Sequence, residues 1–398
     1  MLYNRTIKNV SELNRVPDPT PLAGILLLLA SACNYPVQLA PPDTTQIAAA
    51  VIQTLTAEAA AENAASEQIL PHPVFFLSAR GSTVQIWRLD RDGHTITQVS
   101  QGSAPISAFD VSRVDNSVAY ISANQLAILD IVSGDIQLLV DESDANATSE
   151  DYAAEERVSD PLFSPDGSVL AYGLNGVWLL DLDSGESSHL LKNSVSQDQE
   201  LYSPLAWSPD GRKLLISISS QESVLLGVLT PGEGPELIRF ESEGLICCHV
   251  SWSADSQSVL VASPYLGLTE AGLWLYDAAT GEWTRLIGED ELYEFVGWPL
   301  DLPNGDLMFF YSSSADVPQV EVPLYALRAA ADGISGRIRI REDALNISEA
   351  LWAEDGSLAL IVAARPDGGG SGPLVLVHGD GRQLQVLVDS ASNLHWGR

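Results

Sequence analysis

From residue 73 to the end of the chain, short apolar segments alternate with polar turns. Typical apolar segments are SVLAYG at 168–173, KLLISIS at 213–219 and SVLVAS at 258–263. A second segment then often ends in Asp and a glycine turn, as in LWLYDAATGE from Leu273. Runs of four to eight such residues bounded by Gly, Pro and Asp are typical of β-strands. The pattern predicts an all-β domain over residues 73–398.

One aromatic residue marks each repeat of these strands. The seven positions, 44 to 54 residues apart, are Phe109, Phe163, Trp207, Trp252, Trp298, Trp352 and Trp396. Four of them begin related turn sequences: FSPDG at 163–167, WSPDG at 207–211, WSADS at 252–256 and WAEDG at 352–356. Four short strands in each repeat are the pattern of a β-propeller blade. We expect the aromatic residues to pack between neighbouring blades.

The SPDG-containing units resemble the WD-repeat-like propeller repeat of the TolB family over roughly residues 73–398. The resemblance implies a propeller fold and a binding role, and it brings no catalytic residue with it. Two units, FDVSRVDN from Phe109 and WPLDLPNG from Trp298, keep the aromatic residue and lose the SPDG turn.

The two ends of the repeat region complement each other. The first unit begins with PVFFLS at 73–78 and lacks a first strand, whereas the chain ends with a strand, 392–396, that no unit follows. Pairing these ends would hide two open strand edges. The sequence therefore predicts a seven-bladed β-propeller of four-stranded antiparallel blades, with an N/C-terminal velcro closure.

Residues 1–72 have a different pattern. The 12-residue apolar run Pro21–Ala32 suits the core of a signal peptide and is too short to span a membrane. The motif that follows, LASAC at 29–33, resembles the bacterial lipobox, which implies cleavage before Cys33 and a lipid on its thiol. The alternative is an ordinary secretory signal with a chance cysteine. We expect an exported protein, anchored on the extracytoplasmic side by the lipid on Cys33 alone.

A tether is predicted between the signal peptide (1–32) and the propeller. Residues 33–72 are rich in Ala, Thr and Pro, and Ile47, Val51 and Leu55 recur there at the spacing of a short helix. A spacer that holds the domain away from the membrane is the favoured interpretation, and a helical oligomerisation segment is the alternative.

The charge of the chain limits its partners. It contains 53 Asp and Glu against 20 Lys and Arg, which gives a formal net charge of −33. Such a chain is a poor partner for nucleic acid or an anionic lipid surface. A protein or a small-molecule ligand of the cell envelope is the expected partner.

The long segments between the predicted blades are acidic and would share one face of a propeller. Long loops on a rigid scaffold often carry binding. The candidate binding face consists of Asp141, Glu142, Asp144, Glu150, Asp151, Glu155, Glu156, Glu241, Glu243, Glu289, Asp290 and Glu291. It would recruit a basic protein, a cationic ligand or Ca²⁺. The alternative is a solvated rim that only keeps the protein soluble. Beyond this weak indication of Ca²⁺, the sequence predicts no cofactor.

The sequence Cys247-Cys248-His249 is the one unusual constellation. Three interpretations stay open: two buried reduced cysteines, a vicinal disulfide, or a soft-metal site that includes the histidine.

No catalytic motif is present. A Gly-x-Ser-x-Gly elbow is absent, and the six histidines have no metal-ligand spacing. The expected function is that of a lipid-anchored extracytoplasmic propeller acting as a protein- or ligand-binding or scaffold module of the cell envelope. The alternative is a carboxylate-dependent hydrolase or lyase with its site at the central pocket, since the fold does not decide the function.

Overall fold

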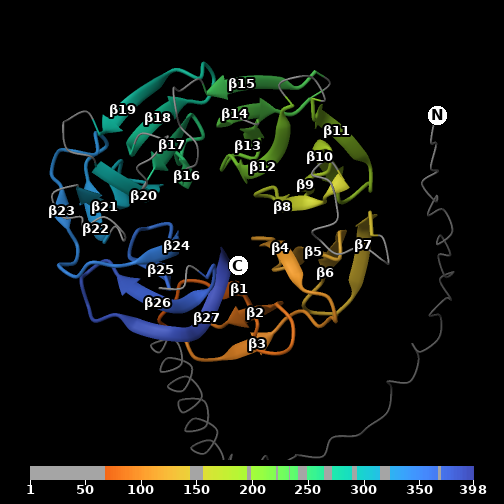
Figure 1. The fold of residues 1–398 in the computed structure, drawn as a ribbon, viewed down its shortest axis with the longest axis horizontal. Helices are drawn as coiled ribbons and strands as arrows, with labels where there is room; N and C mark the ends of the chain where they lie inside the picture. Colours follow the sequence, from red (N-terminus) through yellow and green to blue (C-terminus); the bar gives the residue numbers. More distant parts are fainter. Residues whose placement is uncertain are drawn as a thin grey trace, which may run out of the picture. The chain divides into compact units, whose positions relative to one another are not determined.

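In the computed structural model of the chain, the residues described are 68–143, 156–194, 199–220, 223–232, 234–240, 249–263, 271–288, 294–313, 323–365 and 369–398. They all belong to one of the chain's two compact units, Asn63–Arg398. Over these ranges, 27 strands form six antiparallel sheets arranged in a ring (Figure 1). The described residues contain no helix long and apolar enough to cross a membrane. The predicted all-β propeller fold is confirmed.

Five sheets have four strands each. In chain order, their strands are β4 (Ile106–Val111), β5 (Val118–Ser122), β6 (Gln125–Leu129) and β7 (Ile136–Asp141); β8 (Ser159–Phe163), β9 (Val169–Gly173), β10 (Gly176–Asp181) and β11 (Ser187–Lys192); β12 (Leu201–Trp207), β13 (Leu214–Ser219), β14 (Val224–Thr230) and β15 (Glu236–Phe240); β16 (His249–Trp252), β17 (Ser258–Ser263), β18 (Gly272–Asp277) and β19 (Trp283–Ile287); β20 (Glu294–Asp301), β21 (Leu307–Ser313), β22 (Tyr325–Ala329) and β23 (Ile338–Arg339).

The sixth sheet has seven strands and contains both ends of the strand sequence. In spatial order these are β24 (Ile347–Trp352), β25 (Leu358–Ala363), β26 (Gly372–His378), β27 (Gln385–Trp396), β1 (Val74–Ser78), β2 (Gln85–Leu89) and β3 (Ile96–Gln98). The long strand β27 pairs with β26 through its first part, where Leu376 faces Gln385. Its last part pairs with β1, where Val74 faces Trp396.

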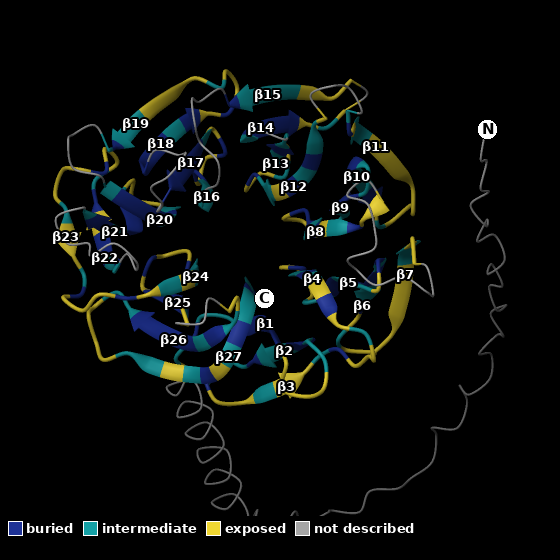
Figure 2. Ribbon diagram, viewed as in Figure 1, coloured by how far each residue is buried: buried dark blue, intermediate teal, exposed yellow. Residues whose placement is uncertain are grey.

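Within each four-stranded sheet, consecutive strands pair from the centre of the ring to the rim. The strands β4, β8, β12, β16 and β20 lie nearest the centre, and β7, β11, β15, β19 and β23 lie at the rim (Figure 1). Buried residues concentrate in the middle strands of the sheets, the innermost strands are mostly half-buried, and exposed residues lie on the rim (Figure 2). The core is therefore a series of apolar layers between neighbouring sheets.

Three of the repeated tryptophans connect one sheet to the preceding one along the chain, and a fourth, Trp396, connects β27 to β24 within the seven-stranded sheet. The indole Nε1–H of Trp252 donates to the carbonyl of Ala206 at 3.3 Å, and that of Trp352 donates to the carbonyl of Trp298 at 2.8 Å. Trp207 and Trp396 donate in the same way to the carbonyls of Leu162, at 3.2 Å, and of Trp352, at 2.7 Å. The side chains of Phe109 and Phe163 are buried and have no such donor.

The SPDG turns are stabilised by side-chain hydrogen bonds. The Ser164 hydroxyl donates to Asp166 at 2.6 Å and accepts the backbone N–H of Val169 at 3.0 Å, while Gly167 has a φ of 72°. The hydroxyl also lowers the pKa of Asp166. Where the motif is lost, other residues make the turn. Asn116, with a φ of 66°, takes the left-handed position in one such hairpin.

The described part of the chain begins with residues 68–72, which the sequence assigns to the tether. The N–H groups of Ile69 and Leu70 both donate to the carbonyl of Arg91 at 3.0 Å, and the Leu70 side chain is buried with Val74 and Leu89. This short segment therefore packs on the seven-stranded sheet.

Candidate functional site

The structure describes only part of the predicted acidic face. Asp141 ends β7, and Glu142 and Glu156 lie at the two ends of the acidic segment that follows. The remaining acidic positions fall outside the described residues: Asp144, Glu150, Asp151, Glu155, Glu241, Glu243, Glu289, Asp290 and Glu291. Cys33, Cys247 and Cys248 fall outside them as well.

One buried amide holds the two ends of that acidic segment together. Asn124 Nδ2 donates to the carbonyls of Glu142 and Glu156, both at 3.0 Å, and its Oδ1 accepts the N–H of Val158 at 2.8 Å. Ala123 and Asn124 both have positive φ, as in the two-residue hairpin between β5 and β6. Sequence analysis missed this role, although an Asn between two apolar strands is a recognisable hairpin signal.

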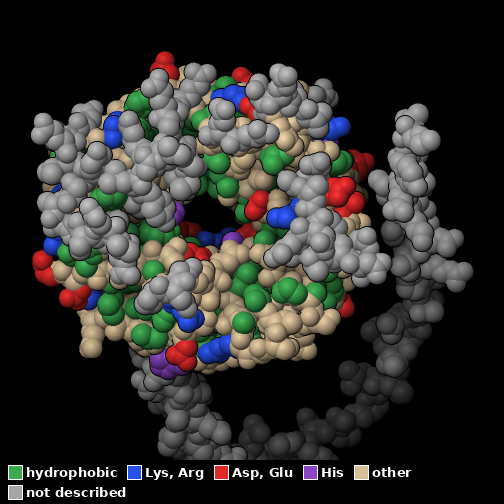
Figure 3. Space-filling model, in the orientation of Figure 1, with side chains coloured by type: hydrophobic (Ala, Val, Ile, Leu, Met, Phe, Trp, Pro, Cys, Tyr) green, Lys and Arg blue, Asp and Glu red, His purple; other side chains and the backbone are tan. Residues whose placement is uncertain are grey.

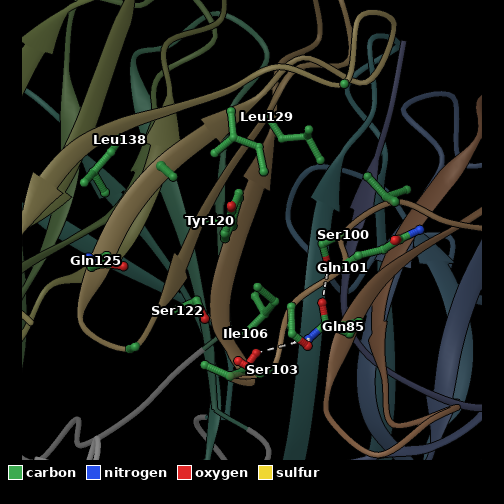
Figure 4. Close-up of a pocket in the computed structure, with 17 residues that line it drawn as sticks. Gln85, Ser100, Gln101, Ser103, Ile106, Tyr120, Ser122, Gln125, Leu129 and Leu138 are labelled. Atoms are coloured by element: carbon green, nitrogen blue, oxygen red, sulfur yellow. Dashed lines mark hydrogen bonds between the residues drawn. The ribbon is translucent and has the colours of Figure 1, made fainter. Parts of the chain in front are cut away.

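A groove of about 690 Å³ lies between two sheets of the described part of the chain. One wall comes from β2 and the segment 99–104, and the other comes from the β4–β7 sheet (Figure 4). We call it the β3–β7 groove. Its labelled lining residues are Gln85, Ser100, Gln101, Ser103, Ile106, Tyr120, Ser122, Gln125, Leu129 and Leu138.

The groove is open because the rim strands on its two sides differ in length and polarity. On one side β3 has only three residues, and Thr97 and Gln98 are polar. On the other side β7 presents Ile136 and Leu138, whose exposed fractions are 59 % and 50 %. These side chains line the groove and would be covered by a longer apolar strand opposite.

The wall on the β2 side is fixed by a small hydrogen-bond network. The buried Gln85 donates through Nε2 to the carbonyl of Ala104 at 3.1 Å. Its Oε1 accepts the Ser100 hydroxyl at 2.9 Å, and that hydroxyl accepts the N–H of Ile86 at 2.9 Å. The segment 99–104 is therefore held in place by side chains before any ligand binds.

Three polar side chains in the groove have no hydrogen-bond partner among the described residues. They are Tyr120, Gln101 and Ser103, which come from opposite walls (Figure 4). Burial raises the pKa of Tyr120, so its hydroxyl stays protonated at neutral pH and can donate as well as accept. None of the 17 lining residues is charged or a histidine.

A second polar group lies at the inner strands. His395 Nδ1 of β27 lies 3.0 Å from Asp110 Oδ1 of β4, and Asp110 Oδ2 accepts the N–H of Phe163 at 2.7 Å. His395 Nε2 lies 3.1 Å from Asn393 Oδ1, and the N–H of Asn393 donates to Glu349 at 2.7 Å. We call these side chains the axial cluster. It connects β24, β27, β4 and β8, and Figure 3 shows charged and histidine side chains around the central opening.

Asp160, on the inner strand β8, is a carboxyl group with a raised pKa. Asp160 is exposed in β8, yet desolvation by the surrounding protein raises its pKa, while hydrogen bonds from the hydroxyls of Ser159 and Ser203 act in the opposite direction. The φ of Asp160 is 48°, at an irregularity in the pairing of β8 with β9. A carboxyl that takes up a proton more readily is suited to general acid chemistry.

His249, the described member of the Cys-Cys-His sequence, packs against Trp298 with the ring centroids 3.8 Å apart. Burial lowers the pKa of His249 to about 4, so the imidazole is neutral at pH 7. Its buried Nδ1 has no partner among the residues described. Over the same residues, no group of three or more His, Cys, Asp or Glu side chains is arranged to hold a metal ion.

Comparisons with known proteins give the fold. No family model and no curated protein matches the chain. An oligogalacturonate lyase in complex with manganese has a TM-score of 0.55 at 12 % identity, over 79 % of this chain and 84 % of the lyase. A Mycobacterium tuberculosis puromycin-hydrolysing peptidase has a TM-score of 0.55 at 16 % identity, over 81 % of this chain and 52 % of the peptidase. TolB from Acinetobacter baumannii, a family that the repeats resemble, is also among the similar structures (TM-score 0.47, 14 % identity, 82 % and 67 % covered).

At these identities the similarity concerns the fold alone. The chain spans about half the length of the peptidase. The function must therefore be argued from the chain's own residues.

Proposed function

We propose that this chain is a lipid-anchored, extracytoplasmic propeller that binds a ligand or protein of the cell envelope. In this proposal residues 1–32 are the signal peptide, Cys33 carries the lipid, and 33–72 form the tether, whose last residues, 68–72, pack on the seven-stranded sheet. The strand β27 would serve two blades, as the rim strand of the last and the innermost strand of the first. Six sheets would then contain seven blades closed by the chain ends.

The observation that carries the binding role is the β3–β7 groove. Its volume of about 690 Å³ lies within the range of small-molecule sites, which is roughly 300–1,000 Å³. One wall is preformed by Gln85 and Ser100, and both walls carry polar side chains without a partner among the described residues. Pockets that combine apolar surface with a few fixed polar groups are typical of ligand sites.

The groove opens beside the described part of the acidic face. Gln125 lines the groove, and its Nε2 donates to Asp141 Oδ1 at 3.0 Å. The Ser143 hydroxyl donates to the same carboxylate and lowers the pKa of Asp141, which is therefore ionised at neutral pH. A basic protein partner or Ca²⁺ on this face would lie next to a ligand in the groove.

The alternative, a carboxylate-dependent hydrolase or lyase at the centre of the ring, is favoured by the raised pKa of Asp160. The axial cluster supports it less well. Both oxygens of Asp110 and both ring nitrogens of His395 already have partners within the protein. These groups join strands, so a reacting proton would have to break a hydrogen bond that holds the ring together.

One pair of variants tests the binding role. Leu138→Arg places a charge in the groove, at a half-exposed position. The matched control, Val386→Arg, places a charge on β27, away from the groove, where the side chain is 60 % exposed. Full-length protein in detergent would be incubated with solubilised envelopes and analysed by native mass spectrometry. We expect a bound component that Leu138→Arg loses and Val386→Arg keeps. A component that both variants keep would place binding elsewhere. Substrate turnover that Asp160→Asn abolishes would support the enzyme instead.

A further inference from the structure

We propose that the β3–β7 groove takes a neutral, hydroxyl-rich ligand, namely a short uncharged oligosaccharide. This inference rests on the proposed binding function and names the class of ligand for the same site. It is argued from the charge, the hydrogen-bonding groups and the shape of the groove.

The charge of the lining excludes an ionic ligand. Of the whole chain 18 % of residues are charged, yet none of the 17 residues that line the groove is. A cationic ligand would find no carboxylate inside the groove to replace its water shell. An anionic ligand would find no Arg or Lys, and it would approach a chain of net charge −33. An uncharged ligand avoids the cost of desolvating a charge that has no counter-charge in the groove.

The polar groups of the groove match hydroxyl groups. Side-chain amides and hydroxyls both donate and accept hydrogen bonds, as sugar hydroxyls do. Tyr120, Gln101 and Ser103 are free for such bonds among the residues described. Tyr120 belongs to one wall of the groove, and Gln101 and Ser103 belong to the segment 99–104 of the other (Figure 4). The fixed carboxamide of Gln85 holds the segment that carries two of them, so little ordering is needed on binding.

The apolar part of the groove matches the C–H faces of sugar rings. Ile136 and Leu138 present aliphatic surface beside the ring of Tyr120. A purely apolar ligand would leave the half-buried hydroxyl of Tyr120 without a partner, which is costly. An oligosaccharide offers apolar faces and hydroxyl groups together.

A peptide fits the groove less well. Extended peptides bind by adding a strand to a free sheet edge. The groove lies against sheet faces: β5 is paired with β6, where Tyr120 faces Ala127, and β6 is paired with β7. Both edges of β5 and β6 are already paired, so side chains must make the recognition on this wall.

The test is calorimetric titration of the full-length protein in detergent with short neutral oligosaccharides and with anionic ones of similar length. We expect a neutral oligosaccharide to bind and the anionic ones not to bind. Tyr120→Phe removes one hydroxyl that has no partner among the described residues, so the fold should persist while the affinity falls about tenfold, which corresponds to one lost hydrogen bond of ~1.4 kcal/mol. Leu138→Arg should abolish binding, and Val386→Arg should leave it unchanged.

Several outcomes would overturn the inference. They are the absence of binding by every neutral oligosaccharide, stronger binding of the anionic ones, and an affinity that Tyr120→Phe does not alter. Thermal unfolding of each variant shows whether it is folded. If envelope extract still supplies a component that Leu138→Arg alone loses, the binding function stands and only the ligand class is wrong. If no such component exists either, both fail.

Discussion

Trp396 is the residue whose replacement tests the closure of the ring most directly. Its side chain is 3 % exposed and packs with Leu70 and Val74, and its indole donates to the carbonyl of Trp352 at 2.7 Å. Replacing a buried tryptophan by alanine costs about 3–5 kcal/mol. The carbonyl of Trp352 would lose its indole donor as well, which adds ~1 kcal/mol or more. We expect Trp396→Ala to lower the free energy of unfolding by about 4–6 kcal/mol.

Two further variants separate the contributions of packing and of the indole hydrogen bond to this loss of stability. Trp396→Phe keeps an aromatic ring and loses the indole donor, so it should cost only about 1–2 kcal/mol. Trp207 is the matched control within the ring. It occupies the equivalent repeat position, is less buried, and its hydrogen bond to the carbonyl of Leu162 is longer, at 3.2 Å. Trp207→Ala should therefore cost about 2–3 kcal/mol.

Urea unfolding followed by far-ultraviolet circular dichroism measures these differences without depending on tryptophan fluorescence. A domain is stable by about 5–15 kcal/mol, so the expected loss would shift the midpoint substantially. The reasoning is refuted if Trp396→Ala is no more destabilising than Trp207→Ala. In that case the pairing of β27 with β1 would contribute little to the stability of the ring.

Three other predictions concern the anchor, the acidic face and the buried histidine. Cys33→Ser should release the protein from the membrane fraction or leave the signal uncleaved, and unchanged fractionation with normal processing would contradict the anchor. Changing Asp141, Glu142 and Glu156 to Asn and Gln should weaken capture of a basic partner. Salt should weaken capture by the wild-type protein, because exposed charges are screened. If neither the substitutions nor salt changes capture, the acidic face only keeps the protein soluble. The folded-state pKa of His249 is about 4, below the unfolded value of roughly 6.5, so stability should fall by about 3 kcal/mol as the pH drops through this window. His249→Gln should remove that part of the pH dependence of urea unfolding, and an unaltered profile would show that other groups cause it.

The strands and their turns were predictable because each is decided by local chemistry. A hairpin needs a short polar side chain to cap it and a residue that accepts positive φ. Ser164 and Gly167 meet these needs through the SPDG motif, and Ser112 and Asn116 meet them without it. The repeated aromatic residue was therefore a better guide to the repeats than the turn motif.

The connections between sheets were not predictable, because they join residues far apart in the chain. The contact of Asp110 with His395 joins β4 to the end of the chain, and neither residue belongs to a recognisable motif. Asn124 holds the acidic segment at its two ends, yet the spacing of the acidic residues gives no sign of it. Such roles depend on which blade lies next to which, and that is decided only when the ring forms.

The groove is explained by the length of a rim strand, which is a feature that a sequence can show. The rim strands β7, β11, β15 and β19 have five or six residues, whereas β3 has three and β23 has two. The β3–β7 groove is lined by the segment 99–104 that follows β3, and a second cavity of about 300 Å³ is lined by Ile338 and Arg339 of β23. A short rim strand leaves the face of the next sheet uncovered, so the space between the sheets stays open.

The two cavities differ in the charge of the residues that line them. The one beside β23 is lined by Arg328, Arg339, Asp355 and Asp380, and Arg328 is already paired with Asp306 at 2.5 Å. A ligand there would compete with ion pairs that the protein makes internally. The β3–β7 groove has no charged lining to satisfy, and its free hydroxyl and amide groups gain partners only when a ligand arrives. For this reason binding is expected beside β3, although both cavities have the same architectural origin.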